Sequence, residues 1–164
     1  MHEKTHQLQI RVTAAEKAAI QRAAARAGMG MSSWVLSRVL PSRQPQFREL
    51  CQALVAAGDD RRYTLAELND FLAALDAADF ADAVREPLPE HLEPYLANYV
   101  AAMVETAANG KGVPAPAWAD SVLPLDEPAF GTPILGVRLH LLTAAPPAFR
   151  RRNIFIDASI GDRV

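Results

Sequence analysis

The stretch HQLQIRVTAAEK, residues 6–17, joins two patterns that predict different backbone structures. Its first half alternates polar and apolar residues, the period of two that is typical of a half-buried strand. The polar positions are Gln7, Gln9 and Arg11, and the apolar positions are Leu8, Ile10 and Val12. Thr13 and Glu16 then have the spacing of a capping box, which begins a helix. The sequence therefore predicts one short strand, over residues 6–12, directly before a helix.

Helix signals continue along the first two thirds of the chain. A helix over residues 14–27 is predicted to end at Gly28, and a second one, SSWVLSRVL, to begin at a Ser32 or Ser33 cap and to end before Pro41. Residues 42–46 read as a linker. Further helical segments are predicted over residues 47–58, 63–86 (with a second capping box at Thr64 and Glu67) and 90–110.

The composition and the periodicity of the sequence change at Val113. A proline-rich stretch without periodicity follows, but it carries too many large apolar residues for a disordered linker. A short helix over residues 134–145, a turn over 146–153 and a short strand from 154 complete the chain. We therefore expect a mainly α protein with three parts: an N-terminal strand and two helices (1–43), a helical domain (44–112), and an irregular tail with a short helix and strand (113–164).

Charge is unevenly distributed although the net charge is −2. Residues 1–48 carry a formal charge of +6, residues 49–128 carry −11 and residues 129–164 carry +3. A basic N-terminal part on an acidic body indicates that the N-terminal part meets an anion. The single cysteine, Cys51, and the absence of an apolar membrane-length run or signal segment favour a cytoplasmic, bacterial protein.

A lone strand leaves backbone groups unpaired, and its apolar face uncovered. Pairing the strands of two chains antiparallel corrects both faults and places Gln7, Gln9 and Arg11 together on the opposite face. A two-stranded ribbon fits the major groove of DNA, where Gln and Arg bind adenine and guanine at two atoms each. The competing interpretation is a strand in a larger mixed sheet with these three side chains solvated.

On these features residues 5–41 resemble the ribbon-helix-helix (Arc/methionine-repressor-like) family of bacterial repressors and antitoxins. The resemblance implies a homodimer that binds operator DNA, with a phosphate held at the start of the second helix, where GMGMSSW is similar to the family's turn. Gly30 departs from the family, many of whose members carry serine there. The residues so implied are Gln7, Gln9 and Arg11 for bases, Lys4, Thr5, Ser32 and Ser33 for phosphate, and Leu8, Ile10, Val12, Val35 and Val39 for the dimer core.

The remaining 120 or so residues need a second role. The first hypothesis is an antitoxin that represses its own operon and neutralises a protein toxin through its C-terminal part. The alternative is a ribbon-helix-helix transcriptional regulator or plasmid-maintenance protein with a helical sensing or oligomerisation domain. An enzyme is the least favoured class, because no catalytic or metal-ligand spacing is present, and we expect no cofactor and no metal.

The tail offers candidate partner-binding residues: Trp118, Phe130, Phe149, Arg150, Arg151 and Arg152. Aromatic side chains next to arginine are typical of strong interface contacts. The alternative is that the tail completes the chain's own core. For the three arginines, a solvated turn, an acidic surface on this chain or a partner, and a second nucleic-acid contact all remain open.

Overall fold

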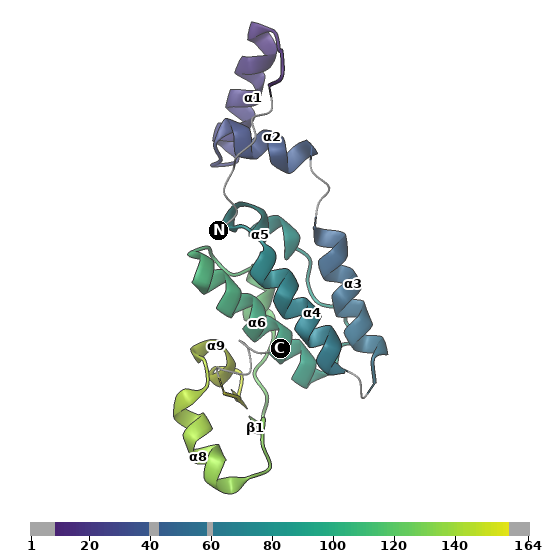
Figure 1. Ribbon diagram of the computed structural model, residues 1–164, viewed down its shortest axis with the longest axis vertical. Helices are drawn as coiled ribbons and strands as arrows, with labels where there is room; N and C mark the ends of the chain where they lie inside the picture. The colour runs from purple at the N-terminus through teal and green to yellow at the C-terminus, as the bar shows by residue number, and fades with distance from the viewer. Residues whose placement is uncertain (1–8, 40–42, 59–60, 158–164) are drawn as a thin grey trace. The chain divides into compact units, whose positions relative to one another are not determined.

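The computed structural model describes residues 9–39, 43–58 and 61–157, apart from the side chain of Ser37. The chain divides into two compact units, residues 1–41 and 42–164 (Figure 1). Both are mainly helical in their described parts, and the second also contains a two-stranded parallel sheet. No helix in these described ranges combines the length and the apolar character needed to cross a membrane.

Over residues 9–39, the described part of the first unit, there are two helices, α1 (Ala14–Arg26) and α2 (Met31–Val39). The predicted capping box of Thr13 and Glu16 is present at the start of α1. The helix ends with Gly28 in the left-handed region, at φ +65°. There the N–H of Met29 donates to the carbonyl of Ala24 over 3.0 Å, and that of Gly28 to Ala25 over 3.1 Å. These are the two bonds of a Schellman motif, which turns the chain sharply into α2.

In the residues that the structure describes, the second unit has four helices before residue 112. They are α3 (Gln44–Ala56), α4 (Arg61–Ala74), α5 (Ala77–Ala83) and α6 (Pro94–Lys111). Helix α6 begins with Pro94, where proline costs no helical hydrogen bond, and ends at Gly112, whose φ is +66°. It contacts α4 and α5 as well as α7 (Ala117–Ser121) and α9 (Pro147–Arg150) of the C-terminal segment. Helix α6 is therefore the central element of the unit.

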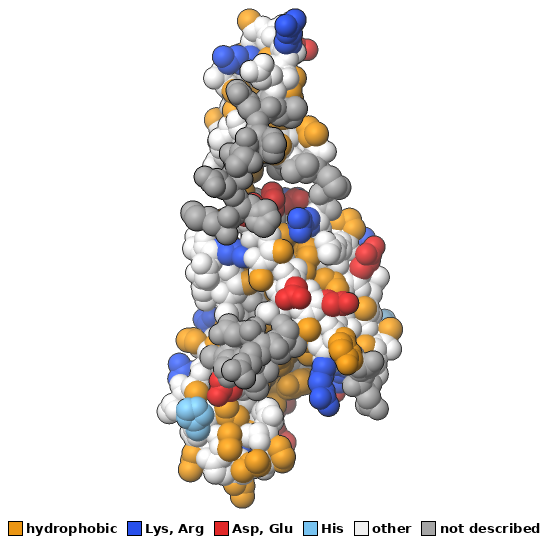
Figure 2. Space-filling model, in the orientation of Figure 1, with side chains coloured by type: hydrophobic (Ala, Val, Ile, Leu, Met, Phe, Trp, Pro, Cys, Tyr) orange, Lys and Arg blue, Asp and Glu red, His pale blue; other side chains and the backbone are white. Residues whose placement is uncertain are grey.

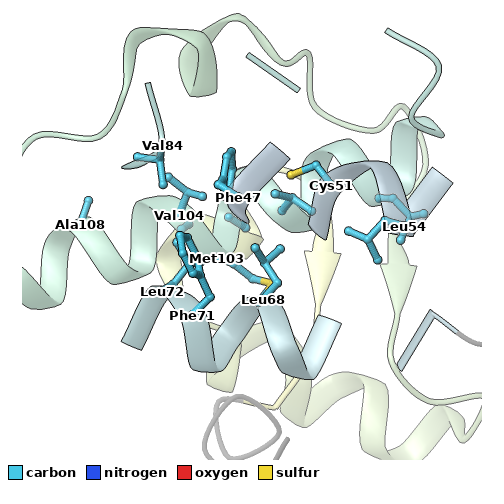
Figure 3. Close-up of a cluster of buried hydrophobic side chains, with 14 of the residues drawn as sticks. Phe47, Cys51, Leu54, Leu68, Phe71, Leu72, Val84, Met103, Val104 and Ala108 are labelled. Carbon is cyan, nitrogen blue, oxygen red and sulfur yellow. The ribbon is translucent and has the colours of Figure 1, made fainter. Parts of the chain in front are cut away.

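The hydrophobic core lies between α3, α4 and α6 (Figure 3). Phe47, Cys51 and Leu54 line one side of α3 at helical spacing and are at most 2% exposed. Leu68, Phe71 and Leu72 face them from α4, and Val104 and Ala108 from α6. Residues 100–105 of α6 are all buried, so this part of the helix has no solvent-facing side.

The C-terminal segment packs on the same core. It consists of α7, β1 (Ala129–Phe130), α8 (Leu135–Ala144), α9 and β2 (Ile154–Phe155), with β1 and β2 paired parallel. Phe149 packs edge-on against Tyr99 of α6, with ring centroids 5.1 Å apart. The Trp118 indole N–H donates to the carbonyl of Val84 over 2.8 Å. Phe149, Ile154 and Ile156 belong to the buried cluster.

A buried ion pair between Arg152 and Glu105 joins the C-terminal segment to α6. Arg152 is 5% exposed and Glu105 of α6 also 5%. The Arg152 guanidinium donates to Glu105 and to the carbonyls of Ala119 (2.8 Å) and Val122 (3.2 Å). Arg151 reaches the other carboxylate oxygen of Glu105 over 2.8 Å.

These contacts overturn part of the prediction that the C-terminal tail forms a partner-binding surface. Phe149 and Arg152 are buried in the chain's own core, and Trp118 is half-buried with its N–H bonded internally. Assigning Phe149 and Arg152 to a partner surface was therefore wrong, because neither side chain can reach a partner without unfolding this segment. Phe130 stacks on Phe155 at 5.1 Å, and Arg150 is exposed.

Several predicted boundaries also differ. The strand over residues 6–12 is not seen: residues 9–12 have irregular backbone, and residues 6–8 lie outside the described ranges. The predicted strand pairs with the same strand of a second chain, and a single chain cannot form those hydrogen bonds. The linker over 42–46 was too long, because α3 already begins at Gln44 with Pro45 in its first turn.

The second predicted capping box was wrong. Helix α4 begins at Arg61, so Thr64 lies inside the helix and caps nothing. The continuous helix predicted over 63–86 is interrupted by Leu75 and Asp76, and Asp76 is the N-cap residue of α5. Helix α2 begins at Met31, one residue before Ser32 and two before Ser33, so neither serine is its N-cap.

Candidate nucleic-acid interface

The segment before α1 exposes the residues predicted to read bases. Gln9 and Arg11 are both exposed. Ile10 and Val12, the alternate positions, are 58% and 43% exposed, which is high for large apolar side chains. The other predicted residues of this segment, Lys4, Thr5, Gln7 and Leu8, lie outside the described ranges.

The capping box fixes how this segment enters α1. Glu16 Oε2 accepts from the Thr13 backbone N–H at 2.7 Å and from its hydroxyl at 2.8 Å. In return, Thr13 Oγ1 accepts from the Glu16 N–H at 3.3 Å. The N–H of Thr13, and then its hydroxyl, hold the pKa of Glu16 below its usual value. The carboxylate charge is thereby engaged at the positive end of α1.

The surface of the first unit is basic over its described part. Between residues 9 and 39, Glu16 is the only acidic residue, whereas the basic side chains Arg11, Lys17, Arg22, Arg26 and Arg38 are all exposed. Arg38 lies over the ring of Trp34, with its guanidinium carbon 5.7 Å from the ring centroid. From the sequence alone, Arg22, Arg26 and Arg38 were not predicted as candidate DNA contacts, because they belong to no motif. The positive net charge of residues 1–48 was the one signal that included them.

The start of α2 offers backbone donors. The first helical bond is donated by Trp34 to the carbonyl of Gly30, at 2.9 Å. The N–H groups of Met31, Ser32 and Ser33 therefore precede the helical hydrogen-bond ladder. Ser32 is exposed, Ser33 is half-buried, and the first turn carries no acidic residue. Such a helix start favours an anionic oxygen through its donors and its dipole.

The apolar residues of the first unit are poorly covered. Ala24 is the only buried residue among those whose side chains are described in this unit. Of the two α2 residues predicted for the dimer core, Val35 is half-buried and Val39 is 67% exposed. With Ile10, Val12 and Met31, Val39 belongs to a set of exposed large apolar side chains in the first unit. The unit thus lacks a hydrophobic core of its own in its described part.

Residues 2–49 match a protein-family model described as NikA-like, mobilization protein NikA. The match covers less than a third of the chain and includes the whole ribbon-helix-helix-like segment. Comparison with curated protein sequences and with solved structures gives no significant match.

Proposed function

We propose that this protein is a dimeric ribbon-helix-helix DNA-binding protein, a regulator or plasmid-maintenance protein that acts by binding and not by catalysis. The observation that carries the proposal is the match of residues 2–49 to a mobilization-protein family over a segment whose described surface is basic. The match names a mobilization protein and not an antitoxin, so it favours the alternative hypothesis over toxin neutralisation. The burial of Phe149 and Arg152 also removes part of the surface on which a toxin contact had been inferred.

Dimer formation is supported by the uncovered apolar side chains of the first unit. Two chains that pair their residues 6–12 would bury Ile10 and Val12 and give both strands a hydrogen-bonded neighbour. In one chain Ile10 is 58% exposed, so an aspartate there costs little in the monomer. In the paired ribbon the same aspartate is buried without a partner, which is costly. Ile10→Asp should therefore abolish the dimer and destabilise the first unit.

Within the dimer, Gln7, Gln9 and Arg11 read bases, while the start of α2 holds a backbone phosphate. The exposed arginines of both helices add attraction that does not depend on sequence. The target is a specific operator-like site, and two-fold symmetry of the protein requires an approximately palindromic sequence.

The test is DNA binding by the full chain to a duplex enriched by in vitro selection and to a random duplex of equal length. Arg11→Ala should weaken binding to the selected duplex by about 1–3 kcal/mol, roughly 5- to 150-fold, and the random duplex much less. Arg62→Ala is the matched control, because Arg62 is an exposed arginine of the second unit. Equal losses on both duplexes would show that Arg11 contacts phosphate, and no binding by the unsubstituted chain would refute the proposal.

A further inference from the structure

A cavity of about 190 Å³ lies in the second unit, partly open to solvent. One side of it is formed by α3, through four lining residues that include Phe47 and Cys51. The other side is formed by Glu86, Pro87 and Pro89, from the segment between α5 and α6. The cavity therefore lies wholly within the second unit, and its occupancy does not depend on DNA binding or on the pairing of residues 6–12.

The inner wall of the cavity is apolar. Phe47 and Cys51 are 2% and 1% exposed and belong to the hydrophobic core (Figure 3). Pro87 and Pro89 add two apolar rings from the other side. Aromatic rings attract one another when their centroids are about 4.5–7 Å apart, and sulfur also makes favourable contacts with aromatic rings. This wall therefore suits a planar, uncharged ring.

The polar residues of the lining lie at the solvent-exposed rim and include an ion pair. Arg48 Nε donates to Glu86 Oε2 over 2.6 Å, and Arg48 Nη2 donates to Glu86 Oε1 over 2.5 Å. The third polar lining residue is Gln52, whose amide is neutral, so the rim carries no net charge. A carboxylate ligand would meet Glu86, and an ammonium ligand would meet Arg48. Both kinds of charged ligand are therefore disfavoured.

The volume limits the ligand to one small ring. An apolar cavity of about 150 Å³ holds a benzene molecule, whereas sites for drug-sized ligands have volumes of about 300–1,000 Å³. The rim offers donors from Arg48 and Gln52 and acceptors from Glu86 and Gln52, a set that suits a group able to donate and to accept, such as a hydroxyl.

We propose that this cavity is a binding site for a small neutral phenol. The ring packs against Phe47 and the two prolines, and the hydroxyl donates to the carboxylate of Glu86. Such a site gives the second unit a role of its own, the recognition of a small molecule.

The test is binding of phenol to the full-length chain, measured by calorimetric titration and by NMR of the ¹⁵N-labelled protein. Phenol should bind at one site per chain and shift the backbone amide signals of Cys51, Gln52 and Leu88. Cyclohexanol, which has no aromatic face, and benzoate, which carries a negative charge, are the comparison ligands. Each should bind at least fivefold more weakly than phenol.

A substitution at the rim should reverse the preference between phenol and benzoate. Glu86→Gln removes the carboxylate and leaves Arg48 without its charged partner. Phenol should then bind more weakly, because it loses a charge-assisted hydrogen bond, and benzoate should bind more tightly, because the rim becomes positive.

The matched control is a charged pair away from the cavity. The face of the molecule in Figure 2 shows acidic and basic side chains interspersed on the second unit. Arg61 and Glu93 form such a pair at 2.6 Å, with side chains 38% and 51% exposed, and neither residue lines the cavity. Their exposure is similar to that of Arg48 and Glu86, at 50% and 38%. Glu93→Gln should therefore leave the affinities for phenol and benzoate unchanged.

Four results would overturn the proposal. Absence of phenol binding, or phenol binding that Glu86→Gln does not weaken, would show that the cavity is not a phenol site. Tighter binding of benzoate than of phenol by the unsubstituted chain would identify an anion site at Arg48. Equal binding of cyclohexanol would show that the wall does not select an aromatic ring. None of these results bears on DNA binding by the first unit, which has its own test.

Discussion

Arg151 and Arg152 are neighbours in sequence and bind the same carboxylate, but they differ in environment. The side chain of Arg151 is 68% exposed, and that of Arg152 is 6% exposed. An exposed ion pair gains little because water screens it, whereas a buried guanidinium depends on its protein partners. The contribution of each residue to stability should therefore be very different.

Replacing each arginine by methionine measures this difference. Arg152→Met leaves Glu105 with only its exposed partner and removes the bonds to Ala119 and Val122, so we expect a loss of about 3–5 kcal/mol in the free energy of unfolding. Arg151→Met is the matched control and should cost about 1 kcal/mol or less. Urea denaturation followed by circular dichroism gives both values. Similar losses for the two variants would contradict the assignment of Arg152 as the buried partner.

At the scale of elements, the turn between α1 and α2 depends on one glycine. Gly28 has a φ of +65°, and a Cβ added there would meet no atom within 4 Å. Gly28→Ser should therefore destabilise the first unit through backbone strain alone, by about 1–2 kcal/mol. Gly30→Ser is the control: its surroundings are equally open, no positive φ opposes the change, and serine is a favoured N-cap. Amide hydrogen exchange of α1 and α2, at fixed protein concentration, should show faster exchange for Gly28→Ser only.

The elements that the sequence predicted well are those with local signals. The capping box of Thr13 and Glu16 and the end of α1 at Gly28 both depend on residues within a few positions of each other. Gln9 and Arg11 are exposed, but so are Ile10 and Val12, and the alternation of residues 6–12 therefore stays a prediction.

The features that could not be predicted depend on residues far apart in the chain. The parallel pairing of Ala129 with Ile154 has no local signal, because each strand is only two residues long. The burial of Arg152 requires Glu105, 47 residues earlier, to be brought beside it. Thr64 and Glu67 had the spacing of a capping box, but the helix begins at Arg61, so Thr64 lies inside it.

At the scale of the whole molecule, the two units should respond separately to mutation. Leu68 is fully buried in the core of the second unit. Leu68→Ala should lower the stability of that unit by about 2–5 kcal/mol while leaving DNA affinity unchanged at temperatures where it stays folded. Each unit holds one of the two tryptophans, Trp34 and Trp118, so fluorescence of single-tryptophan variants reports each unfolding transition. Loss of DNA binding in parallel with the Leu68→Ala transition would show that the units fold as one.

Because Cys51 is buried and is the chain's one thiol, its rate of chemical modification reports how often the second unit opens. Burial raises the pKa of Cys51 to about 12, so at pH 8 very little of the reactive thiolate is present and reagents cannot reach it. An alkylating reagent in solution can then modify the native chain only while an opening motion exposes the thiol, either of α3 or of residues 86–89, which line a pocket with Cys51. At high reagent concentration the rate of modification equals the rate of opening, and at low concentration it follows the fraction of molecules that are open. Mass spectrometry of the intact chain over time would thus record how often this core opens, in a dimer or on DNA, without any label being added to the sequence.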